Sequence, residues 1–224
     1  MFYRSFYYTV DNMFQTIVNL KAYNESTGKN TEILLKTFNN SESSENIKFA
    51  VPLTKTHLGN HFKNLISQHV DPETYGPYTG HVIMEELISS GIKGSLLNHS
   101  ERRVSKPIIR STIARAEELG FKLIICSKDL EEIREVCDMG ADIIAYEPTE
   151  LIGGKISVAT AKPHIIEQAV ALCDKYKSTL LVGAGINNKK DVEISKGLGA
   201  GGILVSSGVV KSKDPFHSLN SLMI

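Results

Sequence analysis

Eight short apolar segments recur along the chain, and most are followed by a longer stretch with the spacing of an amphipathic helix. Within these segments hydrophobic positions do not alternate with polar ones. A short uninterrupted apolar run is typical of a strand that is buried on both faces of a parallel sheet. The predicted strands are residues 16–21, 47–51, 65–70, 94–98, 122–127, 141–147, 179–182 and 201–206.

Signals for helix starts and ends lie between the predicted strands. Ser105 precedes a lysine and Pro107, which is a candidate N-cap followed by an early proline, and Gly120 ends that helical pattern. Ser127 is a candidate N-cap for the next helix, whose acidic first turn suits the positive end of the helix dipole, and Gly140 ends it. The alternation of strands and helices predicts a parallel sheet with right-handed crossovers.

The number of strand–helix units decides between two architectures of this α/β class. Eight units in 224 residues, at roughly 28 residues each, favour a closed (β/α)8 barrel. An open doubly wound sheet usually carries a Gly-x-Gly-x-x-Gly turn after its first strand, whereas the first predicted strand here ends in Asn19-Leu20-Lys21. We therefore predict a single catalytic barrel domain over residues 16–224.

Residues 1–15 precede this barrel and form a predicted N-terminal extension. Residues 1–12 are aromatic and polar without clear periodicity, and Met13 directly precedes the first convincing strand. Two interpretations are open. Either the extension packs on the floor of the barrel, or translation of the native protein starts at Met13, and the pattern favours the second.

Charge and composition exclude several classes of partner. The chain has 25 basic and 25 acidic side chains, so its formal net charge is zero. Nucleic-acid binding and attraction to an anionic membrane both require a basic excess, so we predict neither. No segment reaches the ~20 consecutive apolar residues of a membrane span.

Cysteine usage and the N-terminal residues indicate the compartment. The three cysteines are odd in number and lack Cys-x-x-Cys spacing, so we expect neither a disulfide framework nor structural zinc. The first residues lack the aliphatic core of a secretory signal. These features predict a soluble protein of the reducing cytoplasm.

Polar side chains stand at the carboxyl ends of several predicted strands. In a (β/α)8 barrel these ends meet at one rim, where the βα loops converge. Lys21 ends the first strand, His99 follows the fourth, and Glu147 ends the sixth. The seventh and eighth strands lead into Gly183-Ala184-Gly185 and Ser206-Ser207-Gly208. This set predicts a proton-transfer site next to an anion-binding site.

These residues belong to longer motifs that resemble one enzyme family. The motifs are Asn19-Leu20-Lys21, Asn98-His99-Ser100-Glu101-Arg102-Arg103, Tyr146-Glu147-Pro148-Thr149-Glu150-Leu151-Ile152-Gly153, Gly183-Ala184-Gly185-Ile186 and Val205-Ser206-Ser207-Gly208. In their order and strand-end placement they resemble triosephosphate isomerase in its short archaeal form, from about Thr16 to the C-terminus. The resemblance implies a TIM barrel and an aldose–ketose isomerase of glycolysis and gluconeogenesis, without metal or organic cofactor.

The resemblance also implies a role for each reactive group. The reaction would interconvert dihydroxyacetone phosphate and D-glyceraldehyde 3-phosphate through an enediolate. Glu147 would move the carbon-bound proton, and His99 would polarise the carbonyl and shuttle protons between the two oxygens. Lys21 would supply positive potential, and Glu101 would orient Lys21 or another group beside the substrate. The pairing of a glutamate base with a neutral histidine is a known property of the family, carried over here with the resemblance.

The phosphate site implied by the resemblance is built mainly from backbone N–H groups beside small residues. Residues 148–156 would form a mobile lid over it. The sequence Gly153-Gly154-Lys155 stands where Gly-Thr-Gly is usual, so we expect altered lid kinetics rather than an altered reaction. The predicted substrate-binding residues are Asn19, Lys21, Ile152, Gly153, Gly185, Ser206 and Ser207.

Two other functions stay open, together with the state of assembly. A metal-dependent sugar-phosphate epimerase or a lyase is one; such epimerases need paired histidines and aspartates at strand ends, where only His69 and His99 stand. The other is an inactive barrel that serves as a binding protein, which the intact Lys21, His99 and Glu147 disfavour. The resemblance also implies a homodimer or homotetramer, and residues 71–79, with two tyrosines and two prolines, suit an interface.

Overall fold

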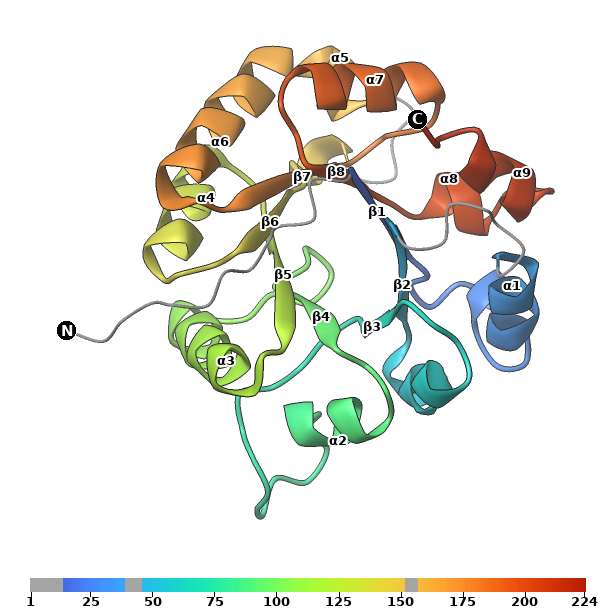
Figure 1. Ribbon diagram of the computed structural model, residues 1–224, viewed down its shortest axis with the longest axis vertical. Helices are drawn as coiled ribbons and strands as arrows, with labels where there is room; N and C mark the ends of the chain where they lie inside the picture. Colours follow the sequence, from blue (N-terminus) through green and yellow to red (C-terminus); the bar gives the residue numbers. More distant parts are fainter. Residues whose placement is uncertain (1–13, 39–45, 152–156) are drawn as a thin grey trace.

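The computed structural model describes residues 14–38, 46–151 and 157–224. Eight parallel strands close into a barrel because β1 pairs with both β2 and β8 (Figure 1). The predicted single-domain (β/α)8 TIM barrel is therefore confirmed. The strands are β1 (Gln15–Asn19), β2 (Ile47–Val51), β3 (Leu65–Ser67), β4 (Gly94–Leu97), β5 (Lys122–Ser127), β6 (Ile143–Tyr146), β7 (Thr179–Gly183) and β8 (Gly202–Val205).

Helices surround the barrel on its outside (Figure 1). Short 3₁₀ helices cover Asn24–Ser26, Leu53–Asn60 and Thr149–Leu151, and the second of these takes the place of an α-helix between β2 and β3. The α-helices are α1 (Asn30–Phe38), α2 (Met84–Ser89), α3 (Lys106–Leu119), α4 (Leu130–Asp138), α5 (Val158–Ala161), α6 (Pro163–Tyr176), α7 (Lys189–Gly197), α8 (Ser207–Val210) and α9 (Pro215–Asn220).

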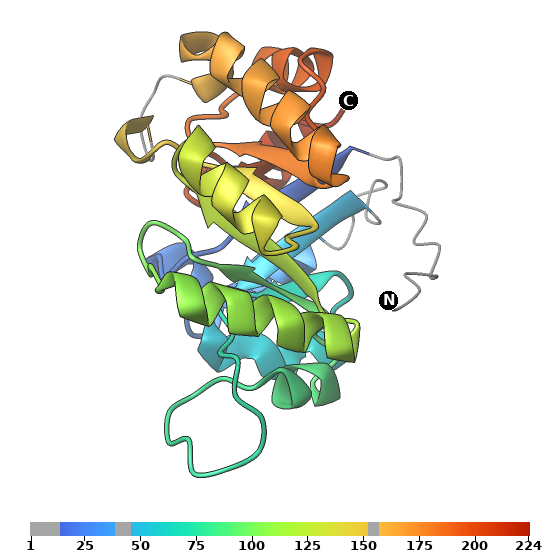
Figure 2. The same ribbon diagram turned by 90° about the vertical axis from the view of Figure 1, so that its left-hand side faces the viewer.

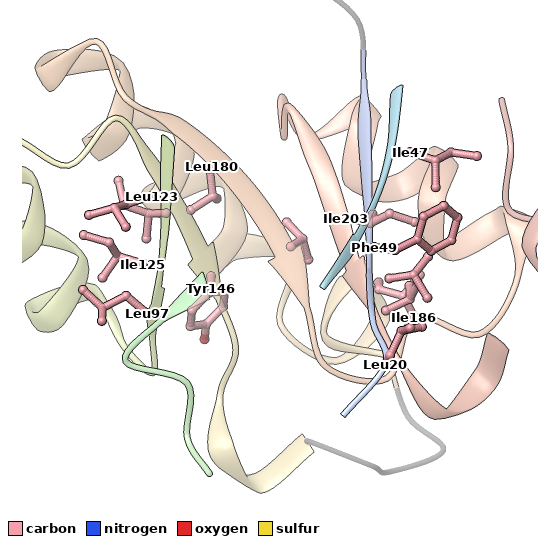
Figure 3. Close-up of a cluster of buried hydrophobic side chains, with 14 of the residues drawn as sticks. Leu20, Ile47, Phe49, Leu97, Leu123, Ile125, Tyr146, Leu180, Ile186 and Ile203 are labelled. Carbon is pink, nitrogen blue, oxygen red and sulfur yellow. The ribbon is translucent and has the colours of Figure 1, made fainter. Parts of the chain in front are cut away.

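The uninterrupted apolar runs of the strands fill two separate cores. One core lies between the strands and the helices, where side chains such as Leu123 and Ile125 of β5 point outward (Figure 3). The other fills the inside of the barrel, because alternate residues of a strand point to opposite faces. The inner core consists of Ile17, Ala50, Ile66, Leu96, Ile124, Cys126, Ala145, Leu181 and Leu204.

Several predicted boundaries differ from the observed ones. The third strand ends at Ser67 rather than at residue 70, because the Ser67 hydroxyl donates to the carbonyl of His69 at 2.7 Å and turns the chain. The sixth strand begins at Ile143 rather than at residue 141, because the N–H of Ala141 is bound to the carbonyl of Val136 at the end of α4.

The N-cap predicted for α4 is wrong by two residues. Asp129, not Ser127, occupies this position, and its side chain accepts the N–H of Glu132 at 2.8 Å. Ser127 is still the last residue of β5. A carboxylate next to the helix N-terminus also interacts favourably with the helix dipole, so an aspartate serves this cap well.

The predicted extension, residues 1–15, lies mostly outside the described residues, and so does Met13. The chain enters the barrel at Gln15, one residue before the predicted domain boundary. Within the described ranges, every helix is too short or too polar to traverse a lipid bilayer.

The connection between β3 and α2 extends away from the body of the barrel (Figure 2). It contains the predicted interface segment, residues 71–79. Tyr75 and Tyr78 on this segment are 75% and 43% exposed.

Candidate active site

A pocket opens at the carboxyl ends of the strands, where the sequence motifs were expected to meet. Four predicted site residues share this pocket with the ends of β7 and β8: Asn19 and Lys21 at the end of β1, His99 after β4 and Glu147 after β6. The lining residues are Asn19, Lys21, Tyr23, His99, Glu147, Ala184, Gly185, Ile186, Asn187, Leu204, Val205, Ser206, Ser207 and Gly208.

Lys21 is held in the pocket by its backbone and by its charged end. It has a left-handed backbone (φ 49°), and its N–H donates to Asn19 Oδ1 at 3.0 Å. Its ammonium lies 2.7 Å from Glu101 Oε1, and the Lys21 side chain is only 11% exposed. The Asn19 carbonyl accepts the Ser206 hydroxyl at 2.7 Å, which joins the ends of β1 and β8.

His99 is a neutral imidazole whose remaining proton is on the nitrogen that lies beside Glu147. Its Nδ1 accepts the backbone N–H of Glu101 at 3.2 Å, so in the neutral ring the proton is on Nε2. Nε2 lies 3.5 Å from Glu147 Oε2. Burial, and then the positive charge of Lys21, lowers the pKa of His99 to about 4. At neutral pH this imidazole therefore acts as a hydrogen-bond donor without carrying a charge.

Glu147 is a buried carboxyl group with little hydrogen bonding. It is 7% exposed, and its Oε2 has no hydrogen-bond partner among the described residues. Burial raises the pKa of Glu147 to about 7, against the opposing effects of the Cys126 thiol and of Lys21. A general base with a pKa near the working pH is efficient because it is both available and basic enough.

Gly183, the last residue of β7, makes room for the Glu147 side chain. A Cβ atom at Gly183 would lie 2.6 Å from Glu147 Cγ, well inside van der Waals contact. The carboxyl group therefore packs against bare backbone. From the sequence, this glycine is predicted only as part of a small-residue loop.

The opposite side of the pocket is formed by small residues and main chain. Ala184 and Gly185 both have left-handed backbones, with φ of 73° and 72°. Ser206 and Ser207 lie where β8 passes into α8. With few side chains in the way, an anion can approach the backbone closely here.

Some predicted site residues fall outside the pocket or outside the described ranges. Ile152, Gly153 and the rest of residues 152–156 are not among the described residues. The start of the predicted lid is the 3₁₀ helix Thr149–Leu151, where Glu150 is ion-paired with Lys162. Glu101 is itself 56% exposed in its side chain and touches the pocket only through Lys21 and His99.

Tyr23, Asn187 and Leu204 line the pocket but belong to none of the predicted site motifs. The Asn187 side chain donates to the carbonyl of Gly185 at 2.6 Å, and the Lys211 ammonium lies 5.3 Å from the centre of the Tyr23 ring. Tyr23 and Asn187 each stand two residues after a predicted site residue. That proximity is the signal from which they could have been found.

Comparison with known proteins is consistent with this geometry. The family model for triosephosphate isomerase matches residues 15–223. The chain belongs to the triosephosphate isomerase family. The start of the match coincides with the first residue of β1, so the triosephosphate isomerase match takes in every described strand.

Three archaeal proteins named triosephosphate isomerase are similar to the chain over almost its whole length. The protein of Thermoplasma volcanium is 49% identical over 213 residues, which cover 94% of this chain and 100% of the relative. The protein of Methanocaldococcus jannaschii is 33% identical, with 92% and 97% covered, and that of Archaeoglobus fulgidus is 34% identical, with 92% and 96% covered.

Proposed function

We propose that the chain interconverts dihydroxyacetone phosphate and D-glyceraldehyde 3-phosphate by proton transfer between adjacent carbons. The observation that carries this proposal is the arrangement of His99 and Glu147. A neutral imidazole N–H and a buried carboxyl group lie 3.5 Å apart at the mouth of a barrel. Such a pair can remove a proton next to a carbonyl while it stabilises the charge that develops on the carbonyl oxygen.

The proposed reaction moves one proton between adjacent carbons and one between the two oxygens, and it needs no oxidant. The Glu147 carboxylate takes a proton from the carbon beside the carbonyl, and the electron pair of that C–H bond forms the enediolate. His99 Nε2–H donates to the carbonyl oxygen and then passes protons between the two enediolate oxygens. Glu147 returns its proton to the neighbouring carbon, which completes the exchange of ketose for aldose.

Lys21 and Glu101 would set the electrostatics of this step. The Lys21 ammonium supplies positive potential to the phosphate and to the developing oxyanion. Glu101, 2.7 Å from that ammonium, fixes the end of an otherwise flexible side chain. We therefore assign Lys21 to substrate binding and catalysis, and Glu101 to the orientation of Lys21.

The phosphate would occupy the small-residue side of the pocket. Asn19, Gly185, Ser206 and Ser207 are the described residues to which we assign it, together with Lys21. The positive φ of Gly185 and the start of α8 at Ser207 support this assignment, because they leave main chain open to an anion. Ile152 and Gly153 remain predicted members of this site.

We propose that the enzyme self-associates, as a dimer or a tetramer, and works in cytoplasmic glycolysis and gluconeogenesis. The exposed tyrosines of residues 71–79 support association, since aromatic side chains are enriched in interfaces. Sedimentation of the wild type and of Tyr75→Ser tests it. A monomeric wild type at micromolar concentration would end this part of the proposal.

The function is tested by the turnover of glyceraldehyde 3-phosphate with and without 2-phosphoglycolate, an enediolate mimic. We expect competitive inhibition, and turnover that persists in excess chelator, which a metal-dependent epimerase would not show. His99→Ala should lose roughly 10²- to 10⁴-fold in kcat. The control His164→Ala alters an exposed histidine on α6 and should keep wild-type activity. Folded wild-type protein without turnover would revive the binding-protein alternative.

A further inference from the structure

Asn98 is a buried asparagine directly between β4 and His99. It is 1% exposed and has a left-handed backbone with φ of 61°. Asparagine adopts this conformation more readily than most residues. The hydrogen bonds of the Asn98 side chain explain why an amide suits this buried position.

The side-chain oxygen of Asn98 closes the loop that carries His99 and Glu101. Oδ1 accepts the backbone N–H of Val104 at 3.2 Å, so one side chain joins the two ends of residues 98–104. The Asn98 carbonyl accepts the guanidinium of Arg103 at 3.1 Å. Inside the loop, the N–H of Arg102 donates to the carbonyl of His99 at 2.8 Å.

The side-chain nitrogen of Asn98 attaches this loop to the neighbouring strand and helix. Nδ2 donates to the carbonyl of Cys126 on β5 at 3.0 Å and to Glu132 Oε1 on α4 at 3.2 Å. Glu132 in turn is ion-paired with Arg103 and accepts the N–H of Lys128 at 2.8 Å. Glu132 is thereby fixed in place, and both hydrogens of the Asn98 amide have a defined acceptor.

The position and tautomer of His99 depend on this loop. The Nδ1–Glu101 hydrogen bond that leaves the proton on Nε2 is formed entirely within residues 98–104. If the loop opened at Val104, the Glu101 N–H would move away from Nδ1. The ring could then change tautomer or turn, and Nε2–H would no longer lie beside Glu147.

We propose that Asn98 is a positioning residue whose amide closes this loop and so holds the His99 Nε2–H toward Glu147, with Glu132 orienting the amide. Asn98 is not among the residues that line the pocket, and it acts through the loop that carries His99. The effect on turnover rests on the proposed function, whereas the effect on the histidine tautomer does not.

Two single variants test the amide in different ways. Asn98→Asp keeps the shape but places an oxygen against the Cys126 carbonyl and the Glu132 carboxylate. Asn98→Gly keeps the left-handed backbone and removes the amide. Each should lower kcat by about 10- to 100-fold, since a shift of about 1 Å in a reacting group has this effect. KM should rise by a smaller factor than kcat falls, because Gly185, Ser206 and Ser207 lie on other loops and only Lys21 is tied to this loop, through Glu101.

A double variant separates positioning from general damage. When Asn98→Asp is combined with Glu132→Gln, the carboxylate and the amide exchange places, so the amide now on α4 can donate to the carboxylate now in the loop. The oxygen at residue 98 still faces the Cys126 carbonyl, so we expect kcat to recover only in part, by about two- to tenfold over Asn98→Asp alone, as for one restored hydrogen bond. The control Asn60→Asp alters an exposed asparagine that donates to the carbonyl of Ser89, far from the pocket, and should leave kcat unchanged.

The tautomer is measured directly by ¹⁵N NMR of the histidine rings, with the His99 signal assigned by its loss in His99→Ala. The wild type should show a neutral Nε2–H ring, and Asn98→Gly should show a shift toward the other tautomer or an averaged signal. This measurement needs no turnover, so it supports or overturns the inference even if the proposed function fails. Folded Asn98→Gly with an unchanged His99 signal, whatever its kcat, would overturn it.

Discussion

The two sides of the pocket are built by opposite means. On the side of β4 and β6, the reactive groups are the long side chains of His99 and Glu147. Both are held by burial, and His99 also accepts the backbone N–H of Glu101. On the side of β7 and β8, the pocket wall consists of small residues whose backbone conformation shapes the surface, with Ala184 and Gly185 both at positive φ.

The difference follows from what each side is expected to do. A proton-transfer group requires a tuned pKa, and burial supplies it by raising the pKa of Glu147 and lowering that of His99. An anion that is bound by main-chain N–H groups requires close approach, and small side chains supply that. Variants on the first side should therefore act mainly on kcat, and variants on the second side mainly on KM.

The largest effect is expected for Glu147→Gln on the proton-transfer side. Loss of the base should lower kcat by roughly 10²- to 10⁴-fold. Binding of 2-phosphoglycolate, measured by calorimetry, should persist because the residues assigned to the phosphate are intact. Glu193→Gln, an exposed change on α7, is the control. Retention of most of the turnover would mean that another group is the base.

Lys21→Met removes a charge that serves both sides. A hydrogen bond to a charged group contributes about 1.5–3 kcal/mol, so KM should rise by about 10- to 100-fold, and kcat should fall as well. Steady-state kinetics at constant ionic strength measures both. A change in kcat alone would place Lys21 entirely on the proton-transfer side.

Gly183→Ala tests the room beside Glu147. The new methyl group would lie 2.6 Å from Glu147 Cγ and would displace the carboxyl group, so kcat should fall by about 10- to 100-fold with little change in KM. Gly197→Ala is the matched control, because a Cβ at that helical glycine meets no atom within 4 Å. Unchanged kcat in Gly183→Ala would show that Glu147 can shift freely.

The pH profile tests the tuned pKa values. Glu147 must be ionised to act as a base, and its pKa is raised to about 7, so kcat/KM should fall about tenfold per pH unit below that value. His99 should stay neutral until the pH approaches 4. Because the substrate phosphate also titrates near pH 6, ¹³C NMR of the glutamate carboxyls gives an independent reading. A signal that titrates near 7 should be absent in Glu147→Gln.

The smallest effect is expected for Ser206→Ala on the phosphate side. The substitution removes the hydrogen bond from the Ser206 hydroxyl to the Asn19 carbonyl. KM should rise by about two- to tenfold, as for the loss of one hydrogen bond, with kcat nearly unchanged. If kcat fell and KM did not, the division of labour between the two sides would be wrong.

The arrangement of the barrel could be predicted from the sequence because its signals are local. Apolar runs without alternation mark strands that are buried on both faces, and parallel strands bring their carboxyl ends to one rim. That rule alone placed Lys21, His99 and Glu147 in one pocket. The strand ends were less accurate, since residues such as Ser67 and Ala141 form hydrogen bonds to turns and helix ends that periodicity does not reveal.

The supporting contacts of the site could not be predicted in the same way. Asn98 binds acceptors that are 28 and 34 residues away in sequence, on β5 and α4. Gly183 is required by the side chain of Glu147, which directly follows the adjacent strand β6. Such requirements arise only when neighbouring strands are aligned in register, and the register of these pairs is not encoded in any short motif.

The left-handed backbones of Lys21 and Ala184 have a consequence for engineering. A side chain other than glycine or asparagine in this conformation costs roughly 1–3 kcal/mol, a sizeable share of the 5–15 kcal/mol that keeps an ordinary domain folded. Heat resistance could therefore be gained at the rim by a change such as Ala184→Gly, whereas Lys21 cannot be exchanged without loss of its ammonium. At this rim, a substitution chosen for stability can therefore remove a group that turnover requires.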